Sequence, residues 1–179
     1  NRFTRYRYSA DDPQSLSNNT VWSVCEDRDR NLWVATWRGL CRARLDERPI
    51  RFQRYVHDAR NPAGLGADNI RVLYVDRAGT LWVGTWGAGL DRFDAQTQTF
   101  RHYRHDPKNA RTLSSNLVLS IYQDSRGNLW VGTGDAGLNL YHPESDSFER
   151  FRHDPQDPSS LNNNIVSAIF EDRAGTLWI

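Results

Sequence analysis

A repeat of 48 or 49 residues organises the whole chain. A Leu-Trp dipeptide recurs at this spacing, and an aspartate stands five residues before each copy. The copies of the dipeptide are Leu32-Trp33, Leu81-Trp82, Leu129-Trp130 and Leu177-Trp178. A fixed period of this length is typical of stacked supersecondary units. A residue that recurs in every unit is most simply explained by the folding of the unit, so function is sought where the units differ.

Charge and composition exclude some classes of function. The 179 residues carry 23 basic and 22 acidic side chains, so the net charge of +1 creates no field that would attract nucleic acid. No apolar run approaches the ~20 residues of a membrane-spanning helix. The last repeat breaks off after Leu177-Trp178-Ile179, where earlier copies continue, so we expect the chain to be part of a longer protein. Cys25 and Cys41 are expected on the first and third strands of one sheet, roughly 9–10 Å apart, and therefore as free thiols.

Each repeat begins with a short run rich in β-branched and aromatic residues, as strands require. The four runs are residues 21–27, 70–76, 118–124 and 166–172. Polar and apolar residues alternate only in part, which predicts an inner strand buried on both faces. A tight hairpin follows, in which the aspartate caps backbone N–H groups and a glycine supplies a positive φ. Arg30 replaces this glycine in the first repeat, which should strain the turn by ~1 kcal/mol.

Three further strands complete the unit. In the second repeat they are expected at 81–85, near 90–93 and at 100–105, and a Pro/Asn/Ser loop at 106–116 leads to the next unit. A four-stranded antiparallel unit of this length predicts an all-β fold made of β-propeller blades. We assign blades to residues 21–57, 70–105 and 118–153, an outer strand to 3–8 and a partial blade to 166–179. Because a propeller needs ~4–8 blades, residues 1–179 are predicted to form one incomplete propeller segment, with an open array of β-meanders as the alternative.

The residues shared by the repeats are interpreted as structural. We expect the tryptophans to pack between blades, the aspartates to cap the hairpins and the glycines to shape them. These residues are Trp33, Trp82, Trp130 and Trp178; Asp76, Asp124 and Asp172; and Gly79, Gly127 and Gly175.

Several motifs resemble chemical sites, but each of them repeats with the fold. Residues 27–31 start like a calcium loop, yet they lack its glycine and its twelfth-position glutamate. His57, His105 and His153 each precede an aspartate once per blade, whereas a metal needs its ligands to converge on one point. The outer strands mix arginine with aromatic residues, as a half-exposed sheet does without binding nucleic acid. We therefore predict no catalytic residues, no metal site and no cofactor.

Ligand-binding residues are predicted where the repeats disagree. After a threonine shared by three repeats the sequence differs, and it places Trp37, Arg38, Trp86 and Asp135 there. An exposed tryptophan can stack on a sugar-like or aromatic ligand, while a neighbouring charge binds its polar edge. Asn69 and Asn116 could line the same mouth, although capping their own loops is the alternative role. Loop variation without function is the alternative for the whole set.

Taken together, the motifs closely resemble the two-component regulator propeller repeat. They stand here as Ser160-Leu161-Asn162-Asn163-Asn164, as Glu171-Asp172-Arg173-Ala174-Gly175-Thr176-Leu177-Trp178, and as Trp82-Val83-Gly84-Thr85-Trp86-Gly87-Ala88-Gly89-Leu90. The likeness covers the whole chain. It departs from the repeat at Arg30 and Ala35, where glycine is expected, and at Gly134-Asp135, where two other copies have tryptophan.

This resemblance implies a ligand-sensing periplasmic segment of a bacterial signalling receptor, without catalytic activity of its own. Members of the family join such propellers to a membrane-proximal β-sandwich, one transmembrane helix and a kinase or cyclase output. The implied partners are a small-molecule ligand such as an oligosaccharide, the rest of the receptor chain and a second receptor copy in a homodimer, but not nucleic acid. Two alternatives stay open: a lyase or glycosidase whose site lies in blades outside this chain, and a protein-interaction scaffold.

Overall fold

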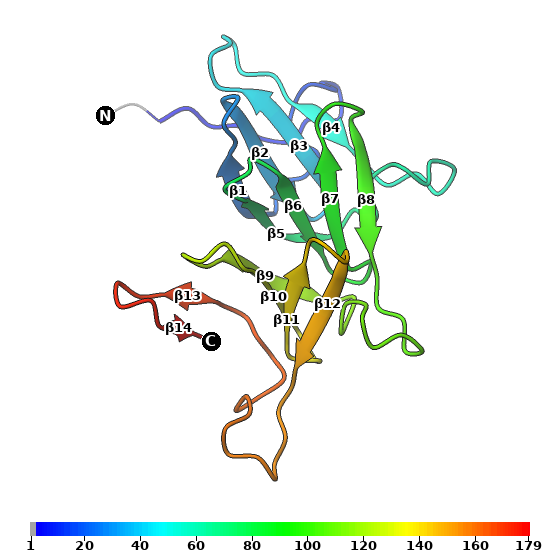
Figure 1. Ribbon diagram of the computed structural model, residues 1–179. Coiled ribbons are helices and arrows are strands. Elements are labelled where there is room, and N and C mark those ends of the chain that lie inside the picture. Colours follow the sequence, from blue (N-terminus) through cyan, green and yellow to red (C-terminus); the bar gives the residue numbers. More distant parts are fainter. Residues whose placement is uncertain (1–2) are drawn as a thin grey trace.

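The computed structural model describes residues 3–179, and all of their regular structure is β-strand (Figure 1). The strands are β1 (Val21–Glu26), β2 (Asn31–Thr36), β3 (Gly39–Arg44), β4 (Gln53–Tyr55), β5 (Ile70–Val75), β6 (Leu81–Thr85), β7 (Leu90–Asp94), β8 (Thr99–Tyr103), β9 (Val118–Gln123), β10 (Leu129–Thr133), β11 (Leu138–His142), β12 (Ser147–Phe151), β13 (Phe170–Glu171) and β14 (Leu177–Trp178). Residues 3–179 contain no helix that is long and apolar enough to cross a membrane.

The strands form successive antiparallel sheets that follow the order of the chain. Blade 1 is the sheet β1-β2-β3-β4, blade 2 is β5-β6-β7-β8 and blade 3 is β9-β10-β11-β12, while β13 and β14 pair as the beginning of a fourth sheet. In Figure 1 the first strands of the sheets lie toward the left of the molecule, and the last strands of blades 1–3 lie toward the right. The prediction of an all-β fold of four-stranded antiparallel blades is confirmed.

Residues 3–8, predicted as an outer strand, form no strand in the structure. Their only ladder contact is an isolated parallel bridge between Tyr8 and Leu16, and the side chain of Phe3 is 95% exposed. In each complete blade the outer strand pairs with the third strand of its own sheet. No such third strand lies beside residues 3–8 in the described part of the chain, so their backbone groups have no ladder to join.

Aromatic side chains fill the space between blades. The Trp33 ring of blade 1 packs edge-on against Phe93 of blade 2, with 5.0 Å between ring centroids. Trp82 of blade 2 repeats this contact with Tyr141 of blade 3 at 5.2 Å. Trp33 and Trp82 are only 1% and 2% exposed, so each stabilises the contact between two consecutive sheets.

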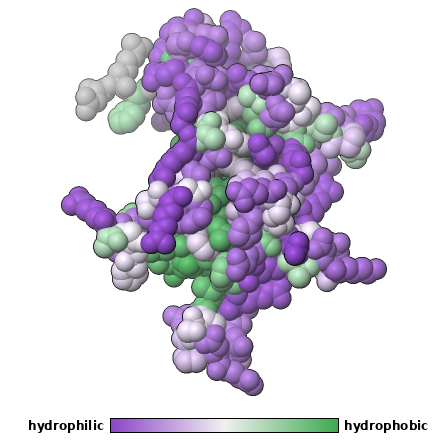
Figure 2. Space-filling view, in the orientation of Figure 1, coloured by the Kyte–Doolittle hydropathy of each residue, from purple (hydrophilic) through white to green (hydrophobic). Residues whose placement is uncertain are grey.

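Each end of the row of blades leaves uncovered a surface that packs against a neighbouring blade elsewhere in the chain. On β1, which was expected to be buried on both faces, Val21 and Val24 are exposed because no sheet precedes blade 1 in the described chain. At the other end, a cavity of about 460 Å³ beside Trp130 occupies the place that an aromatic residue fills next to Trp82. Figure 2 shows hydrophobic side chains gathered in the lower middle of the surface, where β9–β11 lie in Figure 1.

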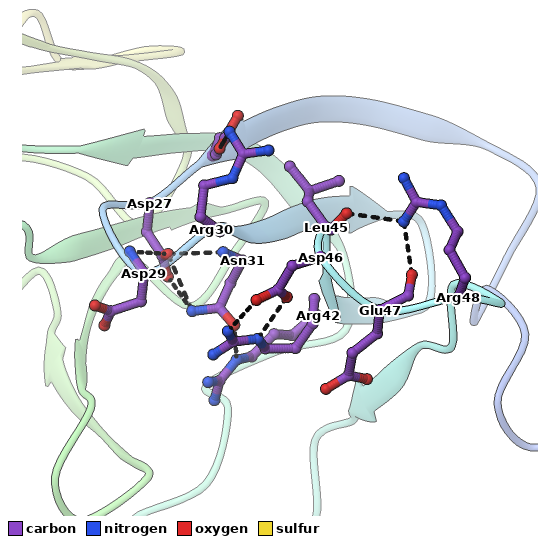
Figure 3. Close-up of polar contacts among 11 residues, drawn as sticks. Asp27, Asp29, Arg30, Asn31, Arg42, Leu45, Asp46, Glu47 and Arg48 are labelled. Atoms are coloured by element: carbon purple, nitrogen blue, oxygen red, sulfur yellow. Dashed lines mark hydrogen bonds and ion pairs between the residues drawn. The ribbon is translucent and has the colours of Figure 1, made fainter.

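Each hairpin between the first and second strands is built on its aspartate. In blade 1, Asp27 Oδ1 accepts hydrogen bonds from the backbone N–H groups of Asp29 and Asn31, at 2.9 Å each (Figure 3). The other carboxylate oxygen accepts a hydrogen bond from Trp33 Nε1 at 2.7 Å. Burial raises the pKa of Asp27, but the hydrogen bonds from Trp33 and Asn31 outweigh this effect and lower it overall.

The link between aspartate and tryptophan recurs in every copy. Trp82, Trp130 and Trp178 donate from Nε1 to Asp76, Asp124 and Asp172 at 2.8, 3.0 and 2.9 Å. The aspartate therefore holds both the turn and the orientation of the indole that packs between blades. Glycines 79, 127 and 175 have φ near +90°. Arg30 adopts φ +63° at the same position, and a positive φ strains a residue that has a side chain.

Candidate functional site

The first strands of blades 1–3 contain the same irregularity. In β5, the paired residues Ile70 and Val72 enclose Arg71, which has no partner on β6. The same register shift leaves Trp22 without a partner in β1 and Leu119 without one in β9. A bulge of this kind redirects the side chain of the extra residue. The three redirected side chains occupy equivalent positions on neighbouring first strands.

These side chains line a cavity of about 280 Å³. We call it the axial cavity, because the first strands of a propeller surround its central axis. Its lining residues are Trp22, Ser23, Arg71, Val72, Leu119 and Ser167. Every copy of the repeat contributes at least one of them, and none of them is acidic.

Two tryptophans from the loops between second and third strands contact residues that line this cavity. The rings of Trp22 and Trp37 lie 6.1 Å apart between centroids. The Arg71 guanidinium carbon lies 3.8 Å from the centroid of Trp22 and 5.8 Å from that of Trp86. We call these four residues the axial cluster. Its tryptophans are 41%, 50% and 48% exposed in chain order, so all three are partly accessible from solvent.

The loop that carries Trp86 is held by backbone hydrogen bonds. Thr85 Oγ1 donates to the Gly89 carbonyl at 2.8 Å and accepts from Ala88 N at 3.0 Å. Trp86 N donates to the Asn69 carbonyl at 2.9 Å, and Gly89 N donates to the Asn116 carbonyl of the next blade at 3.0 Å. The backbone at Trp86 is therefore fixed between two blades, which pre-organises its ring for contact with a ligand.

The structure gives the two predicted asparagines structural contacts. Asn116 Oδ1 accepts a hydrogen bond from His105 N at 2.8 Å, which caps the loop between blades. The equivalent cap in the preceding loop is Asp68, which accepts from His57 N at 2.7 Å. Asn69 is therefore one residue beyond the position of Asn116 in its repeat. It contributes its carbonyl, not its side chain, to the loop of Trp86.

Arg38 and Asp135 stay outside the axial cluster. Both are exposed, and neither side chain has a hydrogen bond or ion pair within residues 3–179. Asp135 follows Gly134, which takes the place of Trp37 and Trp86 in blade 3. The row of exposed tryptophans therefore ends at that blade. Of the six predicted ligand-binding residues, the structure brings only Trp37 and Trp86 into one cluster.

Sequence reasoning missed Trp22 and Arg71. The signal was present, since the four equivalent positions on the first strands carry Trp22, Arg71, Leu119 and Ser167. This position differs between repeats as much as the loop positions do. Because it lies in a strand, its residue type is ordinarily explained by packing and does not by itself indicate a ligand contact.

Groups that could support catalysis are occupied by other contacts. Burial raises the pKa of the Cys25 thiol to about 12, so it is protonated near neutral pH. Nδ1 of His57, His105 and His153 faces the carbonyl oxygens of the loop residues Leu65, Leu113 and Leu161 at 2.8, 2.9 and 2.6 Å. No group of three or more His, Cys, Asp or Glu side chains within residues 3–179 could hold a metal ion.

A larger cavity lies away from the axial cavity, at the outer rim of blades 2 and 3. It measures about 440 Å³, and its lining includes Arg101, Tyr103 and Asp146. The carboxylate of Asp146 already accepts hydrogen bonds from Arg101, Tyr103 and Tyr141. This carboxylate lies among the arginines that line the rim cavity, whereas no acidic side chain lines the axial cavity.

Solved structures share this fold. The extracellular domain assigned to a hybrid two-component system of B. thetaiotaomicron matches 90% of the chain at 26% identity with a TM-score of 0.78. One assigned to a one-component system of the same organism matches 91% at 26% identity and 0.71. The chain spans about a fifth of the length of these domains, 22% and 20%. Virginiamycin B lyase from Staphylococcus aureus, at 13% identity and 0.59, shows likeness of fold alone over 89% of this chain and 48% of the lyase.

No curated protein matched the chain in a comparison of sequences. The profile of the two component regulator propeller family matches residues 15–38, 64–87, 112–135 and 160–179. The matched segments fall once in each repeat and contain the Leu-Trp dipeptide, the hairpin aspartate and the exposed loop tryptophans. They cover just over half of the chain. On this evidence the chain belongs to the two component regulator propeller family.

Proposed function

We propose that this chain is a ligand-sensing propeller segment of a bacterial two-component-type receptor. The observation that carries the proposal is the axial cluster beside the cavity, in which Arg71 contacts Trp22 and Trp86, and Trp22 contacts Trp37. Their positions differ between repeats, so packing of the blade does not require these residue types. Exposed aromatic rings of this kind bind the flat faces of sugars or aromatic molecules.

The similarity to extracellular domains supports a location outside the cytoplasm, and we propose the periplasm. The remaining partners follow from the family. They are further blades, a membrane-proximal β-sandwich and a kinase or cyclase output in the same receptor, which acts as a homodimer. The uncovered faces of β1 and of the fourth sheet suit contact with further blades, because they expose the surfaces that are buried between blades 1, 2 and 3.

The segment is proposed to be non-catalytic. Its thiols and loop histidines are engaged in the fold, and the axial cluster offers an aromatic and cationic surface without a general base or a nucleophile. A lyase is the second candidate, since virginiamycin B lyase has the same kind of fold. At 13% identity that likeness concerns the fold alone, so it supports no assignment of residues.

Single substitutions in the complete receptor test the proposal. Trp37→Ala and Trp86→Ala should each raise the half-maximal concentration of an oligosaccharide ligand at least about tenfold, since stacking contributes ~1.4 kcal/mol or more. Arg38→Ala is the matched control, because Arg38 is an exposed residue on the loop of Trp37 that lies outside the cluster. An unchanged half-maximal concentration in both tryptophan variants, with folding intact, would remove this face from consideration.

A further inference from the structure

Arg71 is the arginine that lines the axial cavity, and its guanidinium has no acceptor within residues 3–179. The outer-strand residue Arg54 donates from Nε to the Ser15 carbonyl at 2.8 Å, and Arg150 donates likewise to the Thr112 carbonyl. Within residues 3–179, the guanidinium of Arg71 makes no hydrogen bond or ion pair. Instead it makes cation–π contacts with the rings of Trp22 and Trp86. A fixed but unpaired cation beside a cavity indicates a site for an anionic group.

The stacking geometry leaves the donors of Arg71 free. All five N–H groups of a guanidinium lie in its plane, so a ring against its face does not use them. The β-bulge directs the side chain to the cavity, and contact with Trp22 at 3.8 Å restricts its motion. The planar fork therefore presents parallel N–H donors that match two oxygens of one carboxylate or sulfate.

The surroundings favour an anion that is attached to a ring. No acidic side chain lines the axial cavity, so nothing there competes for the guanidinium. Trp37 and Trp86, each about half exposed, contact residues of its lining, and Ser23 and Ser167 belong to that lining. A volume of about 280 Å³ is small for a ligand pocket, which suits one ring.

We infer that the axial cavity binds an acidic sugar unit, with Arg71 holding its carboxylate or sulfate and the tryptophans of the axial cluster holding its ring. This inference rests on the proposed function and names the class of ligand that it senses. Charged hydrogen bonds to a carboxylate or sulfate are stronger than those to a hydroxyl. The acidic form of a sugar should therefore bind at least about tenfold more tightly than its neutral form.

Matched sugars provide the test. Glucuronate, glucose 6-sulfate, glucose and inorganic sulfate are titrated into the complete receptor protein by calorimetry, with tryptophan fluorescence as a second readout. Both acidic sugars, or one of them, should bind at least about tenfold more tightly than glucose. Tighter binding of glucuronate would identify a carboxylate as the preferred anion, and tighter binding of glucose 6-sulfate would identify a sulfate. Inorganic sulfate should bind weakly, because it has no ring for the tryptophans.

Variants of Arg71 connect the preference to this residue. Arg71→Gln should reduce the affinity for the acidic sugars to that of glucose. Arg71→Lys, which keeps the charge and loses the fork, should fall between the two. Arg38→Gln is the matched control, since Arg38 is exposed on the loop of Trp37 but does not line the cavity. Circular dichroism and the melting temperature establish that each variant is folded.

Several results would overturn the inference. These are equal affinity for acidic and neutral sugars, a preference that survives Arg71→Gln, the same loss in Arg38→Gln, and the absence of saturable binding by all three sugars. If glucose binds and Trp86→Ala abolishes that binding while Arg71→Gln has no effect, the ligand class is wrong but the proposed sensing role stands. If ligand response is also insensitive to Trp37→Ala and Trp86→Ala, the proposed function fails as well.

Discussion

The indole of Trp82 is predicted to stabilise the protein in two separable ways. Its ring lies 2% exposed between blades 2 and 3, against Tyr103 and Tyr141. Its Nε1 donates to the carboxylate of Asp76 at 2.8 Å. Trp82→Ala removes both contributions and should lower the free energy of unfolding by ~3–5 kcal/mol, as expected for a large buried aromatic side chain. Trp82→Phe keeps an aromatic ring and removes the N–H donor.

The hydrogen bond has an ionised acceptor, so its loss should cost more than that of a neutral pair. We expect Trp82→Phe to lower the free energy of unfolding by ~1.5–3 kcal/mol. Asp76 also accepts from the backbone N–H groups of Ala78 and Thr80 at 2.9 Å each. Asp76→Ala should therefore cost ~3 kcal/mol or more, since it removes the turn bonds together with the indole bond. The cycle consists of the unaltered protein, Trp82→Phe, Asp76→Ala and the variant with both of these changes. It should show a coupling of ~1–2 kcal/mol between the two residues.

Urea unfolding at 25 °C, followed by circular dichroism, measures all four proteins of this cycle. Trp86→Phe is the control, because Trp86 is 48% exposed and makes no indole hydrogen bond within residues 3–179. It should stay within ~0.5 kcal/mol of the unaltered protein. A coupling near zero would refute the role of the Asp76–Trp82 link. If Trp82→Ala left stability unchanged but abolished signalling, Trp82 would be a ligand contact and the structural interpretation would be wrong.

Three further substitutions test local features of the fold. Gly89→Ala should destabilise the protein by ~2 kcal/mol or more in urea unfolding, because φ is +84° and a Cβ would lie 2.2 Å from the Tyr103 carbonyl oxygen. Arg30→Gly should raise the unfolding free energy by up to ~1 kcal/mol by relieving φ +63°, and unchanged or lower stability would contradict this. The hydrogen bond to Asp91 raises the pKa of His102. Protonated His102 should therefore stabilise the fold fully below pH ~6.5, and this stabilisation should be lost as pH rises through the raised pKa. His102→Gln should remove this step from a plot of stability against pH, and a step that persists would refute the assignment.

Features carried by local patterns could be predicted from the sequence. The spacing of the repeat and the strand composition gave the four-stranded sheets, and one glycine position gave the turn, including the strained φ of Arg30. The prediction of an outer strand at 3–8 was wrong because a strand depends on a partner that a local pattern does not report. These residues match those of the other outer strands, but a strand exists only beside a partner, and no pattern within 3–8 reports whether the partner is present.

The candidate site was only half predictable, because the β-bulges have no fixed residue type. Trp22, Arg71 and Leu119 occupy the same irregularity and share neither size nor polarity. The alternation of polar and apolar residues along a strand cannot reveal a single unpaired residue. A register shift at that residue moves the residues that follow it to the opposite faces of the strand. Trp37 and Trp86 could be found because they lie in loops, where a large apolar residue is unusual.

Difference between repeats is not sufficient evidence of function, as the third strands of the blades show. Equivalent buried positions hold Cys41, Asp91 and Asn139. Each side chain accepts a hydrogen bond from a backbone N–H of the loop that leads into the first strand of its own blade. The donors are Ser17, Gly66 and Ser114. Three different chemistries perform one structural task, so this variation needs no ligand to explain it.

The axial position contrasts with this behaviour. Trp22, Arg71, Leu119 and Ser167 also differ between repeats, but no hydrogen bond within residues 3–179 gives the Arg71 side chain a structural task comparable to that of Asp91. A position is therefore a strong candidate for ligand contact when it varies between repeats, its polar group lacks a partner in the fold and its side chain lines a cavity. By that criterion Arg71 ranks above Asn116, whose side chain is occupied by His105 N, and above Arg38 and Asp135, which do not line the axial cavity.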